Sequence, residues 1–181
     1  MGKKSLSLVY LMVLFLLVQC EDSKPKPEVK QVTVSAKEAK MQLKSELPSD
    51  ELLAIYIEIK NAMVNDDSTL TSAKLKELQA LVAKKKTEED KEANLALLTK
   101  MEVLATTMES LPFEEQRFSF IELTERFLKW QELHPNSEKL YLQYCPMYKG
   151  GNYWLSMEEA VYNPYYGSKM LRCGVVEKVF N

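Results

Sequence analysis

Apolar residues recur at helical spacing through the middle of the chain. After Pro48, Ser49 can cap a helix, because its side chain can accept a hydrogen bond from the first free backbone N–H groups. The apolar stripe that follows consists of Leu52, Ile55, Tyr56, Ile59 and Met63. Its spacing of three and four residues predicts an amphipathic helix that ends near the polar residues 65–68.

Three more amphipathic helices are expected before residue 135. The second is marked by Leu75, Leu78 and Val82, and the lysines at 84–86 should end it as a solvated helix end. Thr87 and Asp90 resemble a capping box that opens the third helix. The apolar face of that helix is Leu97, Met101, Leu104 and Met108.

The fourth helix restarts after Ser110 and Pro112. Its apolar side is formed by Phe113, Phe120, Ile121, Phe127 and Leu128. Glu122 and Arg126 are spaced for a surface ion pair on this helix. Four such helices with short connections predict a bundle over residues 48–134.

The pattern changes after residues 134–136, where helix formers give way to turn formers. Seven of the nine tyrosines and four of the five glycines of the chain lie between residues 141 and 174. Residues 140–144 and 153–155 are typical of short strands, and residues 149–152 and 163–167 of turns. We therefore expect a mainly α protein: a four-helix bundle with a small, loop-rich C-terminal module, residues 138–181, that contains short strands. Residues 48–181 should form a single globular domain.

The first twenty residues are typical of an export signal. Lys3 and Lys4 precede an apolar run from Leu6 to Val18, which is too short to span a bilayer comfortably. The run ends at Cys20, in a context that resembles the lipobox of bacterial lipoproteins, although Gln19 departs from its usual small residue. This predicts a lipoprotein-type signal peptide at 1–19 and an exported chain, on the periplasmic or cell-surface side, held at a membrane by lipid on Cys20. The alternative is ordinary signal cleavage with a free Cys20.

Residues 20–47 then form the lipidated cysteine and a flexible tether, because this segment is rich in Lys, Glu, Ser and Pro and has little apolar periodicity. The charge balance of the whole chain is nearly even, with 24 basic and 26 acidic residues. This balance argues against a nucleic-acid partner, which needs a strongly basic surface.

Enzymatic activity has little support in the sequence. The single histidine, His134, precedes Pro135 at a predicted helix end, where a surface role is expected, and a catalytic dyad or triad would have to use it. The chain has no CxxC pair and no glycine-rich phosphate loop. We therefore expect that the protein is not an enzyme.

Both remaining cysteines lie in the C-terminal module, each near a methionine. Cys145 and Met147 are two residues apart, and Met170 and Cys173 are three apart, so each pair can point to one side in a strand and in a helical turn respectively. Together they would offer four sulfur ligands, which favour copper(I). The alternative is a disulfide between Cys145 and Cys173 with both methionines in the core. The residues alone leave both open.

Four short motifs of this module resemble those of the family named domain of unknown function 3347. They are the segments 141–147 (YLQYCPM), 153–156 (YWLS), 163–167 (NPYYG) and 170–174 (MLRCG). The helical half also fits, through Tyr56 with the segment 60–66 and through the segment 116–118 with Leu123, so the resemblance spans about residues 49–177.

The resemblance implies a periplasmic helical domain associated with metal efflux. The family occurs alone in exported bacterial proteins and appended to adaptor subunits of CusB-like heavy-metal efflux systems. It therefore favours copper(I) at Cys145, Met147, Met170 and Cys173, with transfer to efflux-pump components. The alternative is a disulfide-stapled interaction module without metal, whose docking surface would be the exposed rings of Tyr148, Trp154 and Tyr165.

Overall fold

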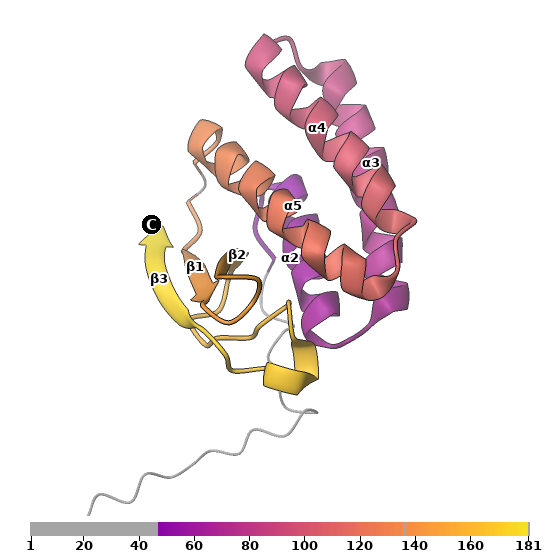
Figure 1. Cartoon of the computed structure of the whole chain (residues 1–181). Coiled ribbons are helices and arrows are strands. Elements are labelled where there is room, and N and C mark those ends of the chain that lie inside the picture. Colours follow the sequence, from indigo (N-terminus) through magenta and orange to yellow (C-terminus); the bar gives the residue numbers. More distant parts are fainter. Residues whose placement is uncertain (1–46, 136, 181) are drawn as a thin grey trace, which may run out of the picture. The chain divides into compact units, whose positions relative to one another are not determined.

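The computed structural model describes residues 47–135 and 137–180, which form four helices and a small sheet (Figure 1). The predicted signal peptide, Cys20 and nearly all of the predicted tether lie outside the described residues. The expected fold class, a mainly α four-helix arrangement followed by a module with strands, is confirmed.

Helix α2 spans Glu51–Val64, and its apolar stripe is buried as predicted except for Ile55, which is partly buried. The predicted cap, Ser49, is wrong by one residue. The Asp50 carboxylate accepts hydrogen bonds from the backbone N–H groups of Leu52 and Leu53, at 2.8 and 3.1 Å. A carboxylate at this position also suits the positive end of the helix dipole, so Asp50 makes the stronger cap.

Helix α3 spans Ser68–Glu88 and continues through the lysines that were expected to end it. Lys85 lies 3.0 Å from the carboxylate of Glu51, and Lys86 lies 2.7 Å from that of Glu102. These partners belong to neighbouring helices, and basic residues in a last helical turn are favourable in any case. The lysines thus lie at the end of α3 as predicted, but the helix ends two residues after them, at Glu88.

The predicted capping box is also wrong. Thr87 lies in the last turn of α3 and donates its hydroxyl to the carbonyl of Lys84. Helix α4, Glu92–Glu109, begins after Lys91, which makes no side-chain cap. The Glu89 carboxylate instead accepts the N–H groups of Asp90 and Lys91, at 3.0 and 2.9 Å.

Helix α5 spans Phe113–Leu133, begins after Pro112 and buries Phe120 and Phe127 as predicted. The expected ion pair between Arg126 and Glu122 is present at 2.5 Å. The main core joins α2, α3, α4 and α5 to residues of the C-terminal module, including Leu140, Trp154 and Tyr165. The module thus shares one core with the helices.

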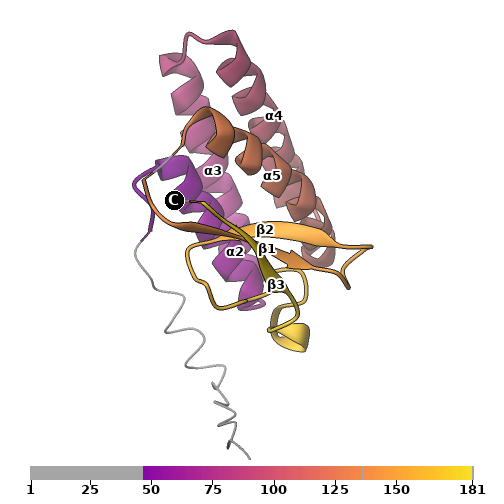
Figure 2. The same cartoon turned by 90° about the vertical axis from the view of Figure 1, so that its left-hand side faces the viewer.

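The C-terminal module contains an antiparallel sheet of three strands, in the order β2-β1-β3 (Figure 2). Strands β1, Leu140–Cys145, and β2, Asn152–Ser156, match the predicted extended segments within a residue or two. A short 3-10 turn, η1, spans Gly167–Met170. Strand β3, Val175–Phe180, was not predicted.

The two edges of this sheet face different surroundings. Strand β2 packs on helices α5 and α2, and the hydroxyl of Tyr56 accepts the backbone N–H of Leu155 at 3.1 Å. Strand β3 lies at the opposite edge, with Val175 and Val179 exposed, and no strand pairs with its outer side among the described residues. The sheet is therefore anchored through β2.

Candidate functional site

The two cysteines of the module come together at one end of the sheet. Cys145 is the last residue of β1 and is fully buried, and Cys173 lies between η1 and β3 and is half-buried. Both are free, and their Sγ atoms are 3.4 Å apart. This separation is longer than a disulfide bond, which is about 2.05 Å. The two halves of the predicted sulfur site therefore meet through their cysteines.

Pairing of β3 with β1 is what brings the cysteines together. Tyr144 lies opposite Val175 in this antiparallel pair, so the segment just before Val175, which carries Cys173, runs alongside Cys145, the residue after Tyr144. The intervening Gly174 has φ +150°, and a Cβ there would lie 2.8 Å from the carbonyl oxygen of Tyr144. The close approach of these segments thus requires a glycine.

Asn163 holds the backbone that carries Cys173. Its buried side chain donates through Nδ2 to the carbonyl of Cys173 at 2.7 Å. Its Oδ1 accepts the backbone N–H groups of Tyr165 and Tyr166, at 2.8 and 3.2 Å, and its own N–H donates to the carbonyl of Leu171 at 2.9 Å. One amide therefore connects the 163–167 turn to the segment that places the thiol.

Replacing Asn163 by Ala is expected to loosen Cys173. The carbonyl of Cys173 and two backbone N–H groups would lose their partner, which should cost about 1–3 kcal/mol in the free energy of unfolding. We also expect several-fold faster reaction of Cys173 with an aromatic disulfide reagent. Asn152→Ala is the control, because it removes one bond, from Nδ2 at the start of β2 to the carbonyl of Tyr148 at 2.6 Å, across the connection between β1 and β2. Equal reactivity in the two variants would contradict the positioning role of Asn163.

The two methionines of the predicted site lie at the surface. Met147 is 62% exposed in the turn after β1, and Met170 is 39% exposed at the end of η1. The Tyr166 hydroxyl donates to the carbonyl of Met147 at 3.0 Å, and the N–H of Cys173 donates to the carbonyl of Met170 at 3.0 Å. Neither methionine belongs to the core, so the alternative that treated both as core residues is wrong.

The protonation state of the thiols follows from their surroundings. Burial raises the pKa of Cys173 above its ordinary value, and the hydrogen bond with Cys145 raises it further. Cys173 is therefore mainly a protonated thiol at neutral pH, and a metal ion that binds it must displace the proton.

The three aromatic rings expected at the surface are buried. Tyr148 is 8%, Trp154 0% and Tyr165 1% exposed. The rings of Tyr148 and Tyr165 stack with centroids 4.6 Å apart, and Trp154 meets Tyr165 edge-on at 5.9 Å. The prediction that they shape a docking surface is wrong, because they fill the core between the sheet and α5.

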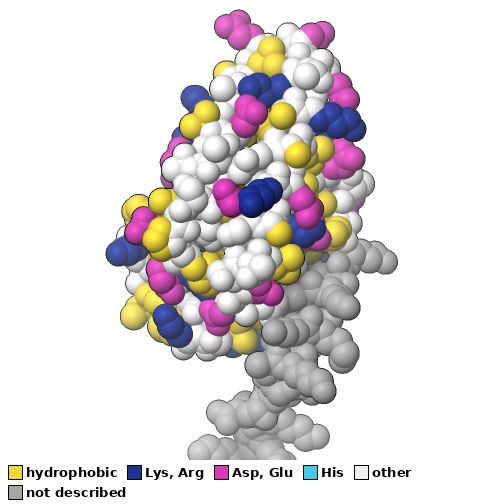
Figure 3. Space-filling view, turned by 90° about the vertical axis from the view of Figure 1, so that its right-hand side faces the viewer, with side chains coloured by type: hydrophobic (Ala, Val, Ile, Leu, Met, Phe, Trp, Pro, Cys, Tyr) yellow, Lys and Arg dark blue, Asp and Glu magenta, His cyan; other side chains and the backbone are white. Residues whose placement is uncertain are grey.

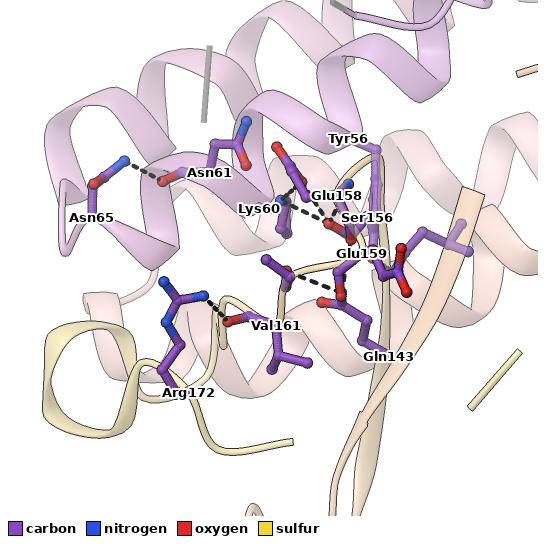
Figure 4. Close-up of polar contacts among 12 residues, drawn as sticks. Tyr56, Lys60, Asn61, Asn65, Gln143, Ser156, Glu158, Glu159, Val161 and Arg172 are labelled. Carbon is purple, nitrogen blue, oxygen red and sulfur yellow. Dashed lines mark hydrogen bonds and ion pairs between the residues drawn. The ribbon is translucent and has the colours of Figure 1, made fainter. Parts of the chain in front are cut away.

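A buried polar cluster that the sequence analysis missed joins α2 to the end of β2 (Figure 4). The fully buried Lys60 ammonium lies 3.0 Å from the Glu158 carboxylate and 3.3 Å from the Ser156 hydroxyl. Ser156 donates to the same carboxylate at 2.6 Å. Gln143 donates through Nε2 to the carbonyls of residues 158–160, which fixes the loop. Lys60 and Ser156 are both 0% exposed, so this cluster joins α2 to the C-terminal module inside the protein.

A second buried cluster centres on Arg117 of α5, which is 1% exposed. Its guanidinium donates to the carbonyl of Met63 at 2.8 Å, to the Asp66 carboxylate at 2.5 Å and to the carbonyl of Pro164. Asp66 in turn accepts the N–H of Ser168 at 3.0 Å. Arg117 therefore joins the end of α2 to the loop that carries Asn163.

A sequence signal for both clusters exists. Lys60 lies four residues after Tyr56, and Arg117 lies four after Phe113, so each occupies a position on the apolar stripe of its helix. A charged residue on a core stripe indicates a buried ion pair, because a buried charge must be paired.

The remaining candidates for a functional site in the described residues are His134 and clusters of possible metal ligands. His134 stacks on Trp130 with centroids 3.8 Å apart and lies 3.2 Å from the Asn94 amide, at the end of α5. Within residues 47–135 and 137–180, no group of three or more His, Cys, Asp or Glu side chains could hold a metal ion. Acidic and basic side chains intermingle on the face that Figure 3 shows. No helix in the described ranges is long and apolar enough to cross a membrane.

Comparison with known protein families gives a match over the helical part of the chain. Residues 52–139 match the family described as "Protein of unknown function (DUF3347)". The match covers α2 to α5 and ends before β1, so the cysteine motifs lie beyond it. No curated protein and no solved structure matches the chain. The resemblance seen in the sequence is therefore confirmed over the helical half, where the chain is similar to the DUF3347 family of proteins of unknown function.

Proposed function

We propose that this protein binds copper(I), or a similarly soft metal ion, at Cys145 and Cys173, with the thioethers of Met147 and Met170 as further ligands. The observation that carries the proposal is the 3.4 Å distance between two free thiols from segments 28 residues apart. Thiolate and thioether sulfur are soft donors, and copper(I) is the common metal ion that prefers them.

The donor set fits a soft ion better than a hard one. Calcium and magnesium need several oxygen ligands, and a structural zinc site needs four Cys or His ligands. The thiol pair offers two sulfurs, and the nearest candidates for more are the exposed methionines two and three residues away. Both methionine side chains are exposed, and the proposal requires them to turn toward an arriving ion.

The proposal extends to the setting of the site. The chain is exported, held at a membrane surface by lipid on Cys20, and passes its metal to efflux-pump components rather than catalysing a reaction. The signal-like residues 1–19 and the family resemblance support this setting. The metal-free interaction module is the weaker candidate, because the rings of Tyr148, Trp154 and Tyr165 that it needs at the surface are buried.

Titration with copper(I) tests the binding. The reduced full chain, with Cys20→Ser to remove the third thiol, is titrated without oxygen against a competing copper(I) chelator. We expect one ion per chain, loss of that binding in Cys145→Ser and Cys173→Ser, and an affinity about tenfold weaker in the Met147→Leu, Met170→Leu double variant.

Met157→Leu is the matched control, because Met157 lies in the same module but is partly buried against the core and does not flank a cysteine. It should bind copper(I) as the parent chain does. Absence of one-to-one binding by the parent chain, or binding that both cysteine variants retain, would overturn the proposal.

The affinity for copper(I) is expected to rise with pH. Since burial raises the pKa of Cys173, its thiol stays protonated through neutral pH, and binding must release that proton. The apparent association constant should therefore increase by about tenfold per pH unit for each proton released, until the thiols ionise on their own. The same chelator competition between about pH 6 and pH 9 measures the slope. A flat profile would indicate ligands other than thiols.

Membrane attachment is expected to depend on Cys20. In cells, the parent chain should sediment with the membrane fraction, and Cys20→Ser should move most of it to the soluble fraction, because the lipid would be lost. Ser23→Cys serves as the control for a nearby change in the same segment. Retention of Cys20→Ser on the membrane would contradict the lipid anchor.

A further inference from the structure

The two thiols differ in how readily a reagent in solution reaches them. Cys145 is fully buried at the end of the central strand β1. Cys173 is half-buried and follows the exposed Arg172 in the turn after η1. A molecule that approaches this surface therefore meets Cys173 first, with the sulfur of Cys145 3.4 Å behind it.

We propose that this pair also carries out thiol–disulfide exchange, in which Cys173 attacks an external disulfide and Cys145 resolves the mixed disulfide that results. An accessible thiol with a second, protected thiol at contact distance is the arrangement that this two-step reaction requires. The partner class is thus a small-molecule or protein disulfide.

The exchange is balanced in atoms and electrons. In the first step, the Cys173 thiolate bonds to one sulfur of the external disulfide, and the other sulfur leaves as a thiolate. In the second step, the Cys145 thiolate attacks Sγ of Cys173 and expels the remaining external thiolate. Two protein thiols are oxidised to one disulfide, one external disulfide is reduced to two thiols, and the protons lost by the cysteines go to those products.

The fold shows which segment would move. The two Sγ atoms must approach by about 1.4 Å to reach the length of a disulfide bond. Cys145 belongs to β1, which is paired with β2 and β3 on its two sides, so its backbone is held. Cys173 lies outside the ladder, where the Asn163 amide holds its carbonyl, so the 171–174 segment is the less restrained of the two and supplies the movement.

One consequence rests on the proposed function. A disulfide has no thiolate to offer a metal ion, so oxidation would release copper(I), and bound copper(I) would protect both thiols from exchange. The exchange reaction itself does not depend on metal binding.

Oxidised glutathione is the probe for the experiment. The reduced full chain with Cys20→Ser is incubated with it at about pH 8, where thiolates form more readily, and is then digested with trypsin and analysed by mass spectrometry. We expect the peptides 140–149 and 173–178 joined by a disulfide. In Cys145→Ser the glutathione adduct on Cys173 should rise about tenfold above the parent chain, because nothing resolves it. In Cys173→Ser the adduct on Cys145 should be about tenfold lower than that, because Cys145 is buried.

The parent-chain result stands even if a variant folds poorly. Absence of the joined peptides, or equal adducts on the two cysteines in folded variants, overturns the inference. A parallel arm is loaded with copper(I) before the probe is added. If the disulfide forms in the metal-free arm and copper(I) does not protect the thiols, the proposed function is contradicted and the exchange reaction is supported. If copper(I) binds tightly but no disulfide forms in the metal-free arm, the exchange reaction is contradicted and the proposed function is supported.

Discussion

Replacing Arg117 by Met should lower the free energy of unfolding by about 3 kcal/mol. The fully buried guanidinium donates to the carbonyls of Met63 and Pro164, and both would be left without this donor. Met fills part of the space, but it supplies no hydrogen bond. Because the Asp66 side chain is 37% exposed, water can partly replace Arg117 there, so most of the loss comes from the carbonyls. Urea unfolding followed by circular dichroism measures the change.

Arg126→Met is the matched control on the same helix. Arg126 pairs with Glu122 at 2.5 Å with both side chains partly exposed, and such surface pairs contribute less than about 1 kcal/mol. Losses of similar size in the two variants would contradict the assigned role of Arg117. The Arg117 variant should also speed the reaction of Cys173 with a thiol reagent, since Pro164 adjoins Asn163.

Glu158→Gln should cost about 3–5 kcal/mol, because it leaves the Lys60 charge buried without its counter-ion. The double variant Lys60→Met, Glu158→Gln should lose less than the two single changes added together, since neither charge then remains unpaired. A urea-unfolding cycle over the parent, both single variants and the double variant gives the coupling. A coupling near zero would mean that the two groups do not interact in solution.

The Glu158→Gln variant should also regain stability as the pH rises. Burial lowers the pKa of Lys60, and the charge of Glu158, which opposes this effect, is gone in the variant. Between the lowered pKa of the folded state and about 10.4, its unfolded value, the unfolded chain holds one proton more. Stability therefore increases with pH through that window. The double variant, which lacks the amine, should not show this rise relative to the parent chain.

The helices were predictable because their signal is local. Stripes such as Leu97 and Met101 of α4 repeat within single helices, and they are buried as expected. The errors in the predicted helix ends occur where the contacting residues are far away in the sequence. Lys85 and Lys86 lie in the last turn of α3 beside Glu51 and Glu102, and the local pattern around residues 84–86 does not include those partners, which belong to other helices.

The contact between the two cysteines of the candidate site also depends on residues that are far apart in the sequence. The spacing of Cys145 and Cys173 could not show that they meet, because the contact depends on β3. That strand has the short pattern of residues 175–180, with Glu177 and Lys178 at its centre, and it forms through pairing with β1, over thirty residues away. The prediction of an aromatic docking surface was wrong for a related reason. The turn-rich composition around Tyr148 and Tyr165 indicated surface loops, whereas both rings belong to the core that the module shares with the helices.

The outer edge of β3, with which no strand of residues 47–135 or 137–180 pairs, bears on how two copies of this protein would meet. Two such edges joined by a twofold axis would run antiparallel, and the axis keeps each residue on its own face of the joined sheet. The two registers with the greatest overlap then place Glu177 opposite Glu177 of the second copy, or Lys178 opposite Lys178. Like charges directly opposite one another repel. The charges of β3 thus disfavour pairing with the same edge of a second copy, and charged residues commonly protect edge strands of soluble proteins in this way.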